Sequence, residues 1–391
     1  MDPNAFQVAF AVDSRAEYGI VRRYLSLLNS SDKVSLSLLA TGAFLEKEFG
    51  SPVTIAEEDG FTVALEAALP RDYSDAHAVV DRMAVCIKKF NDHFDSTRYD
   101  LLVVLGDRYE MLAAALAAAM HKIPILHIHG GESTFGNYDE FIRHSITKFS
   151  TYHFASCEDY RRRIIQLGET PGRVFNMGAL GSENCRLINC SAVSEEVKSF
   201  VGQGPFYVIV FHPETMSPLP PEEQVSRLLE ACSRQHECNL VFIGSNADTG
   251  ALGIKEQVRR FVAAYQNAYY YENLNPDDFL YLTSKAIALV GNSSSGIIEA
   301  PSLGIATVNV GDRQKGRVRA SSVVDVPNCA DQIAAAMRKA RERRKEEVVN
   351  PYFKPHAAQC YFEKTLEVLR ELNHRPAEPK AFYDVPFQYE Y

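Results

Sequence analysis

The stretch between Tyr99 and His144 most restricts the folds available to this chain. It contains two short apolar runs, Leu101–Leu105 and Ile123–His127, separated by the alanine-rich segment Met111–Met120. This spacing is typical of a β-strand, a crossover helix and a second, parallel β-strand. The sequence therefore predicts a parallel sheet with helices packed on its faces.

Short apolar runs and longer amphipathic runs alternate along most of the chain, which favours doubly wound α/β folding. Two such series are visible, one opened by a predicted strand at Phe6–Val12 and the other by Phe206–Phe211. A polar stretch at 185–205 separates them, and residues 51–75 are expected to be irregular. The fold class predicted is α/β, with two Rossmann-like domains facing each other across a cleft. The predicted units are residues 1–190, residues 205–355, and a C-terminal helix and tail, residues 356–391, that packs back on the domains.

Composition excludes several classes of protein. With 391 residues, 46% of them hydrophobic, the chain can bury a large core. Its formal charge of −9 provides no basic field for nucleic acid or membrane surfaces, so neither is expected as a partner. No basic leader opens the chain and no run approaches the ~18 apolar residues of a membrane span. The eight cysteines form no CxxC pair, so free thiols in a cytoplasmic protein are expected.

Chemically active side chains follow the predicted strands where each one ends. In open α/β sheets, ligands bind at the carboxyl ends of the strands, so we expect these side chains to share one crevice. The first predicted domain contributes Arg15, Asp107, Arg108, His129, Glu132 and Asp139. The second contributes His212, Asn246, Ser293, Ser294, Glu299, Arg313, Gln314 and Arg317.

An anion site is predicted in the second domain. The run Gly291–Gly296 leads into a predicted helix, Ser294–Leu303, whose dipole and backbone N–H groups would help to hold an anion. On the first turns of that helix, Glu299 is placed to accept hydrogen bonds from a diol such as ribose. Arg313 and Arg317 could close on a diphosphate with charge-assisted hydrogen bonds.

Structural interpretations compete with several of these assignments. The serines Ser293–Ser295 form a good helix N-cap by themselves, Asp107 could cap the following helix, and His127 suits a buried core. A metal site could be imagined through His127, His129 and Glu132 of the motif HIHGGE, but no Cys or third His is positioned to complete the set, so no metal is predicted. A GxGxxG or GxxxxGK[ST] loop is also absent, which removes the main support for a dinucleotide cofactor or a P-loop.

Several motifs, in this order, resemble those of the hydrolysing UDP-N-acetylglucosamine 2-epimerases of bacterial sialic acid synthesis. They are SRAEYG (14–19), LGDRYE (105–110), HIHGGE (127–132), DEFIRHSITK (139–148), FHPET (211–215), SNADTG (245–250), GNSSSGIIEAPSLG (291–304) and GDRQKGR (311–317). The resemblance implies a glycosyltransferase-B-like fold, with UDP held mainly by the C-terminal domain and no cofactor. It also implies a homodimer or homotetramer, and conversion of UDP-N-acetylglucosamine and water to N-acetylmannosamine and UDP.

The resemblance also implies roles for individual residues. Asp107 and Asp139 become acid/base candidates, because inversion at C2 of the sugar needs proton removal on one face and proton delivery on the other. His212 would neutralise the leaving diphosphate. The implied nucleotide and substrate contacts are Arg15, Arg108, Asn246, Ser293, Ser294, Glu299, Arg313, Gln314 and Arg317.

One position departs from the family pattern. His129 stands where many relatives have a catalytic Glu, so either His129 or Glu132 is expected to take that proton-transfer role. Two other activities stay open: a 2-epimerase acting on UDP-2,4-diacetamido-2,4,6-trideoxyglucose, and a retaining glycosyltransferase with the same nucleotide site. A noncatalytic nucleotide-sugar sensor is a further alternative.

Overall fold

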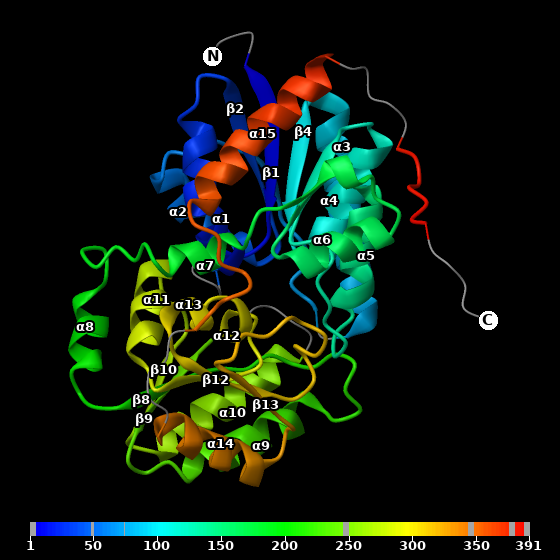
Figure 1. Ribbon diagram of the computed structural model, residues 1–391. Helices are drawn as coiled ribbons and strands as arrows, with labels where there is room; N and C mark the ends of the chain where they lie inside the picture. The colour runs from blue at the N-terminus through cyan, green and yellow to red at the C-terminus, as the bar shows by residue number, and fades with distance from the viewer. Residues whose placement is uncertain are drawn as a thin grey trace.

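The protein has two parallel β-sheets, each covered by helices, one above the other in Figure 1. We call these the N-terminal half, built on strands β1 to β7, and the C-terminal half, built on β8 to β13. The structure is a computed structural model, and the residues that it describes are 5–47, 51–73, 75–244, 250–342, 348–374 and 380–386.

The first sheet has the strand order β3-β2-β1-β4-β5-β6-β7, and every neighbouring pair is parallel. The order reverses direction between β1 and β4, as in a doubly wound sheet. Its strands are β1 (Phe6–Val12), β2 (Val34–Thr41), β3 (Val63–Ala67), β4 (Leu101–Leu105), β5 (Ile125–Ile128), β6 (Tyr152–Ala155) and β7 (Val174–Asn176).

The second sheet repeats this arrangement with the order β10-β9-β8-β11-β12-β13, again all parallel. Its reversal lies between β8 and β11. The strands are β8 (Phe206–Val210), β9 (Asn239–Ile243), β10 (Ala268–Tyr271), β11 (Ala288–Gly291), β12 (Ala306–Val310) and β13 (Val323–Val326).

Helices connect the strands in both halves. Those between β1 and β8 are α1 (Arg15–Asn29), α2 (Val53–Glu58), α3 (Ala76–Ser96), α4 (Tyr109–Met120), α5 (Asp139–Phe149), α6 (Glu158–Gln166), α7 (Leu180–Asn184) and α8 (Glu195–Val201). Those after β8 are α9 (Pro221–Ser233), α10 (Ala251–Ala264), α11 (Pro276–Lys285), α12 (Ser295–Ile298), α13 (Ala300–Leu303), α14 (Ala330–Glu342) and α15 (Ala357–His374).

Alternation along β1 explains how the first sheet packs. Val8, Phe10 and Val12 belong to the core on one face, and Ala9 and Ala11 to the core on the other, because successive side chains of a strand point to opposite faces. The alanines share their core with the alanine-rich helix α4. Small side chains on both elements let α4 lie close to the sheet, and its first turn therefore begins just after the end of β4.

The C-terminal helix α15 crosses back to the N-terminal half, where Figure 1 shows it beside α1. The ring of Tyr361 packs edge-on against Tyr24 at 5.6 Å and Phe154 at 5.0 Å. The described part of the tail also returns to this half, since Nζ of Lys380 donates to the carbonyl of Lys148 at 2.8 Å. The predicted α/β fold with two doubly wound sheets is confirmed, whereas the exact domain limits stay a prediction.

Two predictions of local structure were wrong. The region 51–75 is not irregular, because it contains α2 and β3. β3 lies at the edge of its sheet with partly buried and exposed residues alternating, so it lacks the continuous apolar run of a central strand. The helix predicted at Ser294–Leu303 divides into α12 and α13 at Glu299, because Pro301 has no N–H to continue the hydrogen bonding of α12.

Within the described parts of the chain, we find no helix whose length and apolar character would let it span a bilayer.

Candidate active site

The carboxyl ends of four strands meet at the junction of the two halves. Asp13 follows β1 and Asp107 follows β4, on either side of the reversal in the first sheet. His212 follows β8 and Ser293 follows β11, at the reversal in the second sheet. Such reversals are where open α/β sheets bind ligands. Between them lie two adjoining cavities, of about 150 Å³ and 240 Å³.

The two cavities form one cleft, because they share five lining residues from both halves: Ala16, Ile20, Ser294, Glu299 and Arg313. All the predicted site residues that the structure describes line this cleft. Those in the smaller cavity alone are Asp107, Arg108, His129, Glu132, Asp139, Gln314 and Arg317. Those in the larger cavity alone are Arg15, His212 and Ser293. Asn246 lies outside the described residues.

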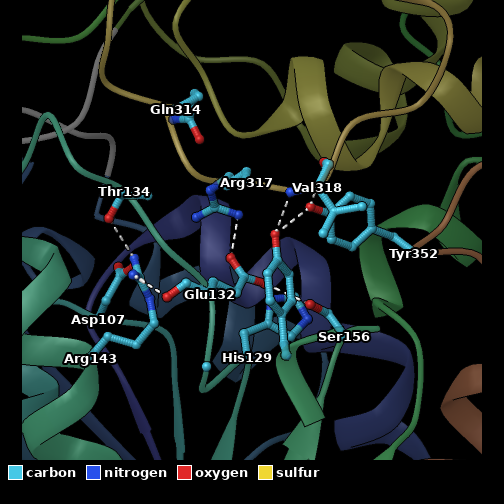
Figure 2. Close-up of polar contacts among 12 residues, drawn as sticks. Asp107, His129, Glu132, Thr134, Arg143, Ser156, Gln314, Arg317, Val318 and Tyr352 are labelled. Carbon is cyan, nitrogen blue, oxygen red and sulfur yellow. Dashed lines mark hydrogen bonds and ion pairs between the residues drawn. The ribbon is translucent and has the colours of Figure 1, made fainter. Parts of the chain in front are cut away.

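The carboxylate of Asp107 is held by Arg143, a fully buried arginine of α5 (Figure 2). Arg143 also donates to the hydroxyl of Thr134 at 2.9 Å and to the carbonyl oxygen of Glu132 at 3.0 Å. Burial works against the ionised form of Asp107, but the positive charges of Arg143 and Arg317 outweigh it and lower the pKa of Asp107. Asp107 is therefore ionised at neutral pH.

The second acid/base candidate, Asp139, has the opposite shift. It begins α5, and its Oδ2 accepts a hydrogen bond from the side-chain amide of Asn137 at 3.0 Å. Burial, together with the negative charge of Asp107, raises the pKa of Asp139 to about 6. Two carboxyls in one cavity thus have pKa values moved apart, which is typical of an acid/base pair.

Glu132 joins the two halves. Its side chain forms an ion pair with Arg317 of the C-terminal half, as Figure 2 shows, and both side chains are buried. The hydroxyl of Ser156 donates to its other oxygen at 2.7 Å, and Nδ1 of His129 lies 3.6 Å from that oxygen. Both carboxylate oxygens of Glu132 are therefore already engaged by protein groups.

His129 has an unusual backbone conformation. Its φ is +65°, in the left-handed region that residues other than glycine rarely adopt. Its own backbone N–H donates to the carbonyl of Phe154 at 2.9 Å. Burial lowers the pKa of His129, so the ring is neutral at pH 7, and among the described residues its Nε2 has no hydrogen-bond partner. A neutral imidazole with one unengaged nitrogen in a cavity can exchange a proton or bind a hydroxyl.

His127, by contrast, lies in the core. It is fully buried, with Nε2 donating to the carbonyl of Gly106 at 2.8 Å and Nδ1 3.2 Å from the hydroxyl of Thr147. Burial lowers its pKa to about 3. Its hydrogen bond to Gly106 supports the backbone at the end of β4, and His127 does not line the cleft.

The larger cavity is more apolar. Leu274, Pro276, Phe279 and Leu280 form one side of it, and the serines after β11 form another. The side chain of Asn292 fixes the loop that carries His212, because it accepts from the His212 N–H at 2.7 Å and donates to the His212 carbonyl at 2.8 Å. Such walls suit a flat ring on the apolar side and a charged group on the polar side.

The anion site in the structure differs from the one predicted from the sequence. Because α12 has only four residues, its dipole is smaller than that of the single helix predicted. Glu299, between α12 and α13, lines both cavities, and burial raises its pKa to about 7. Gly181 makes room for this carboxyl, since a Cβ there would lie 2.1 Å from an oxygen of Glu299.

A comparison with protein-family models identifies the chain. The family described as UDP-N-acetylglucosamine 2-epimerase matches residues 27–364. The chain belongs to this family of enzymes. The polysialic acid biosynthesis protein P7 of Escherichia coli is 41% identical over 97% of this chain and 98% of its own. The hydrolysing GDP/UDP-N,N'-diacetylbacillosamine 2-epimerase of Campylobacter jejuni is 34% identical over 80% of this chain and 82% of its own.

Solved structures agree on the fold. The UDP-GlcNAc 2-epimerase of Methanocaldococcus jannaschii, in complex with UDP-GlcNAc and UDP, superposes with a TM-score of 0.79. The superposition covers 93% of this chain and 99% of the relative's chain, at 15% sequence identity. The two-sheet architecture of this epimerase-family chain is therefore that of a solved relative.

The sequence pattern alone did not reveal a buried carboxyl cluster behind the smaller cavity. Nε of Arg108 lies 3.1 Å from Asp13 and 3.4 Å from Glu110, both fully buried. Glu17, which lines the cavity, is hydrogen-bonded to Asp13. Burial raises the pKa of Asp13 to about 6 and that of Glu17 as well. Arg108 and Glu110, two positions apart in the motif LGDRYE, were the available signal.

Among the residues that the structure describes, no three His, Cys, Asp or Glu side chains are grouped to hold an ion. Glu132 of the HIHGGE motif instead contacts both His129 and Arg317.

Proposed function

We propose that this chain is a hydrolysing UDP-N-acetylglucosamine 2-epimerase, which converts UDP-N-acetylglucosamine and water to N-acetylmannosamine and UDP for sialic acid synthesis. The observation that carries this proposal is a pair of carboxyls, Asp107 and Asp139, with oppositely shifted pKa values in one cavity. That cavity opens into a second one with features suited to a nucleotide. The relative P7, named for polysialic acid biosynthesis, supports the same pathway.

The nucleotide would occupy the larger cavity. We assign the diphosphate to Arg15, His212, Ser293, Ser294 and Arg313, at the boundary between the two cavities. Glu299 would accept hydrogen bonds from the ribose, and the apolar wall at Leu274 and Phe279 would pack against the uracil ring. The M. jannaschii relative was solved in complex with UDP-GlcNAc and UDP, which supports a nucleotide of this class as the ligand of this fold. A nucleotide contact by Asn246 stays a prediction.

The reaction then proceeds by elimination and hydration. A base removes the proton from C2 while the bond from C1 to the diphosphate oxygen breaks, which gives 2-acetamidoglucal and UDP. His212 and Arg313 would stabilise the negative charge that develops on the leaving phosphate. Water then adds to C1 as hydroxide and loses its proton to the solvent, and a protein acid protonates C2 from the opposite face. The sum is hydrolysis with inversion at C2.

We assign the proton removal to Asp107, which is ionised, and the delivery to Asp139, whose pKa of about 6 lets it hold a proton near neutral pH. His129 would replace the Glu of other family members, because its Nε2 is not engaged by the described residues of the protein. Glu132 would serve to close the cleft, since Arg317 and Ser156 occupy both of its oxygens.

The test is incubation of the purified chain with UDP-N-acetylglucosamine alone, in heavy water. Release of UDP and N-acetylmannosamine carrying one deuterium at C2 is expected. A donor that stays nearly intact until an acceptor is added would indicate a glycosyltransferase, and UDP binding without turnover would indicate a sensor. Sedimentation would test the expected homodimer or homotetramer, and cell fractionation the expected cytoplasmic location.

A second substrate has specific support from the comparisons. Relatives in C. jejuni and in Legionella pneumophila, at 34% and 31% identity, are hydrolysing 2-epimerases of N,N'-diacetylbacillosamine nucleotides. This chain is more similar to P7, which favours the mono-acetamido sugar. The ratio of kcat/KM for UDP-N-acetylglucosamine and for its 2,4-diacetamido-2,4,6-trideoxy analogue decides between them.

A further inference from the structure

The loop between β5 and α5 lies directly against the C-terminal half. The backbone N–H of Phe135 donates to the carbonyl of Lys315 at 3.1 Å, and the N–H of Met216 donates to the carbonyl of Gly136 at 3.1 Å. A side chain at Gly136 would not fit, because its Cβ would lie 2.8 Å from the backbone N of Arg313. This loop, residues 133–138, is therefore a closely fitted contact between the halves, and it ends at Asp139.

Within this contact, Thr215 of the C-terminal half fixes the orientation of the Asn137 side chain. The backbone N–H of Thr215 donates to Oδ1 of Asn137 at 3.1 Å, and its hydroxyl donates to the same oxygen at 3.0 Å. The backbone N–H of Tyr138 donates to that hydroxyl at 3.2 Å, which leaves the hydroxyl proton available for Asn137. Because a backbone N–H can only donate, the amide group facing Thr215 must be the carbonyl.

The other end of the Asn137 amide then has one possible role. With its carbonyl on Thr215, its NH₂ group faces Asp139 and donates to Oδ2 at 3.0 Å. Asn137 is buried, so the solvent does not replace these bonds at low cost. A residue of the C-terminal half thus determines, through one rigid amide, which hydrogen bond a carboxyl of the N-terminal half receives.

We propose that Thr215 and Asn137 are positioning residues that align the carboxyl of Asp139 when the two halves close. The inference rests on the proposed function, in which Asp139 delivers a proton to the sugar. Thr215 lies three residues after His212, the proposed neutralising group for the leaving phosphate, and on the same loop after β8. When this loop binds the nucleotide, it therefore also aligns the carboxyl of Asp139.

Neighbouring charges do not replace this contact. Asp107 from the end of β4, Glu140 and Arg143 from α5, and Arg313 from the loop after β12 surround Asp139. Asp107 disfavours ionisation of Asp139, whereas Arg313 and Arg143 favour it. Only Asn137 is described as hydrogen-bonded to the carboxyl, and a point charge does not fix a carboxyl's rotation as a hydrogen bond does.

The experiment is a double-mutant cycle with four variants: Asn137→Ala, Thr215→Val, the double variant, and Thr215→Ser. We expect kcat to fall about tenfold in Asn137→Ala and about threefold in Thr215→Val, the scale of one or two hydrogen bonds to or near a charged group. KM for the nucleotide-sugar and Kd for UDP should change less than about twofold. The double variant should be no slower than Asn137→Ala, and Thr215→Ser should keep wild-type kcat because it retains the hydroxyl.

Two further measurements complete the test. Thr54→Val, on the exposed face of α2, is the matched control for the Thr→Val change. The Asn137 amide stabilises the ionised carboxyl of Asp139, so the Asn137→Ala variant should raise the pKa of Asp139. If Asn137 aligns this acid, the limb of the kcat–pH profile that reports Asp139 therefore moves to higher pH. A purely structural contact would change stability and leave this limb in place.

The proposal is overturned if the losses in the single variants multiply in the double variant, or if Thr215→Ser is as slow as Thr215→Val. Hydrogen exchange separates this failure from failure of the proposed function. With UDP bound, the amides of Tyr138 and Thr215 should be protected, and the Thr215 amide should exchange faster in Asn137→Ala, which removes its acceptor. Absence of that protection refutes the contact. If the wild-type chain releases no UDP from any acetamido nucleotide-sugar, the proposed function is wrong, and the exchange data alone decide on the contact.

Discussion

The two cavities of the cleft differ in how their walls are charged. Around the smaller cavity, Arg108, Arg143 and Arg317 are each paired with carboxylates of the protein itself. The larger cavity has an apolar wall with Phe279 and Leu274, and its polar side is made by a serine loop and His212. Charge in the smaller cavity therefore sets protonation states of protein groups, whereas shape and a few polar groups in the larger one suit ligand binding.

This difference indicates which part of the molecule lowers the stability of the folded state. Buried ion pairs cost desolvation that their mutual attraction only partly offsets, so a row of them is not needed for stability. Carboxyls with raised pKa values, such as Asp13 and Asp139, also disfavour the folded state at neutral pH. We therefore expect substitutions around the smaller cavity to change kcat and stability, and substitutions around the larger cavity, apart from His212 at the leaving phosphate, to change KM.

The largest effect is expected from Asp107→Asn. The amide cannot accept the C2 proton, so kcat/KM should fall at least ~100-fold, the low end of what a general base contributes. UDP affinity should stay within a few-fold, because the nucleotide is assigned to the other cavity. Deuterium incorporation at C2 in heavy water measures the step directly. A wild-type rate of incorporation would remove Asp107 from the mechanism, and Asp100→Asn on the exposed surface is the control.

The next effect tests the link between the halves. Glu132→Gln leaves Arg317 buried without its charge partner, so the free energy of unfolding should fall by about 3 kcal/mol. Urea denaturation followed by circular dichroism measures it. Glu158→Gln, which removes a half-exposed ion pair with Arg161, should cost less than about 0.5 kcal/mol. Equal losses in both variants would mean that the pair with Arg317 is not buried in solution.

Asp139→Asn should stabilise the protein while it impairs catalysis. The folded pKa of Asp139 is about 6 against an ordinary value of 3.8, so the folded state binds more protons in that window. Stability then falls as the pH rises from 3.8 to 6, and this cost stays above pH 6. The variant, which cannot ionise, should be more stable than wild type by roughly 3 kcal/mol at pH 8 and about equally stable near pH 3.5.

Thermal unfolding at the two pH values measures that difference. Asp312→Asn, at an exposed carboxylate, is the control and should be neutral at both. A gain that is the same at pH 3.5 and pH 8 would show that ionisation of Asp139 does not cause it. Loss of activity together with increased stability would locate the free-energy cost of catalysis in the smaller cavity.

The sequence predicts the centre of each sheet better than its edges. The bounds of Phe6–Val12 and Leu101–Leu105 agree with the structure, because strands buried on both faces appear as continuous apolar runs. The edge strands β3, β10 and β13 were not predicted. Each pairs with only one neighbour and has partly exposed residues, so no apolar run marks it.

The site divides in a similar way. Residues that directly follow central strands, such as Asp107 and His212, could be assigned to the cleft because topology alone brings these strand ends together. Arg143 and Asn137 could not, because their importance depends on partners far along the chain. Arg143 meets Asp107 across 36 positions and Asn137 meets Thr215 across 78. The first pairing depends on packing within the N-terminal half and the second on how the two halves pack, and no local pattern encodes either.

The smallest effect is expected in the larger cavity. Ser293→Ala removes one hydroxyl from the loop assigned to the diphosphate, and one neutral hydrogen bond to a ligand is typically a loss of about 1 kcal/mol. KM should therefore rise about fivefold, with kcat unchanged, because the bond is made equally to the bound sugar nucleotide and to the transition state. Ser30→Ala, at the exposed end of α1, is the control. A fall in kcat with unchanged KM would contradict the contrast between the cavities, since it would mean that this serine contacts the leaving group only as the bond to C1 breaks.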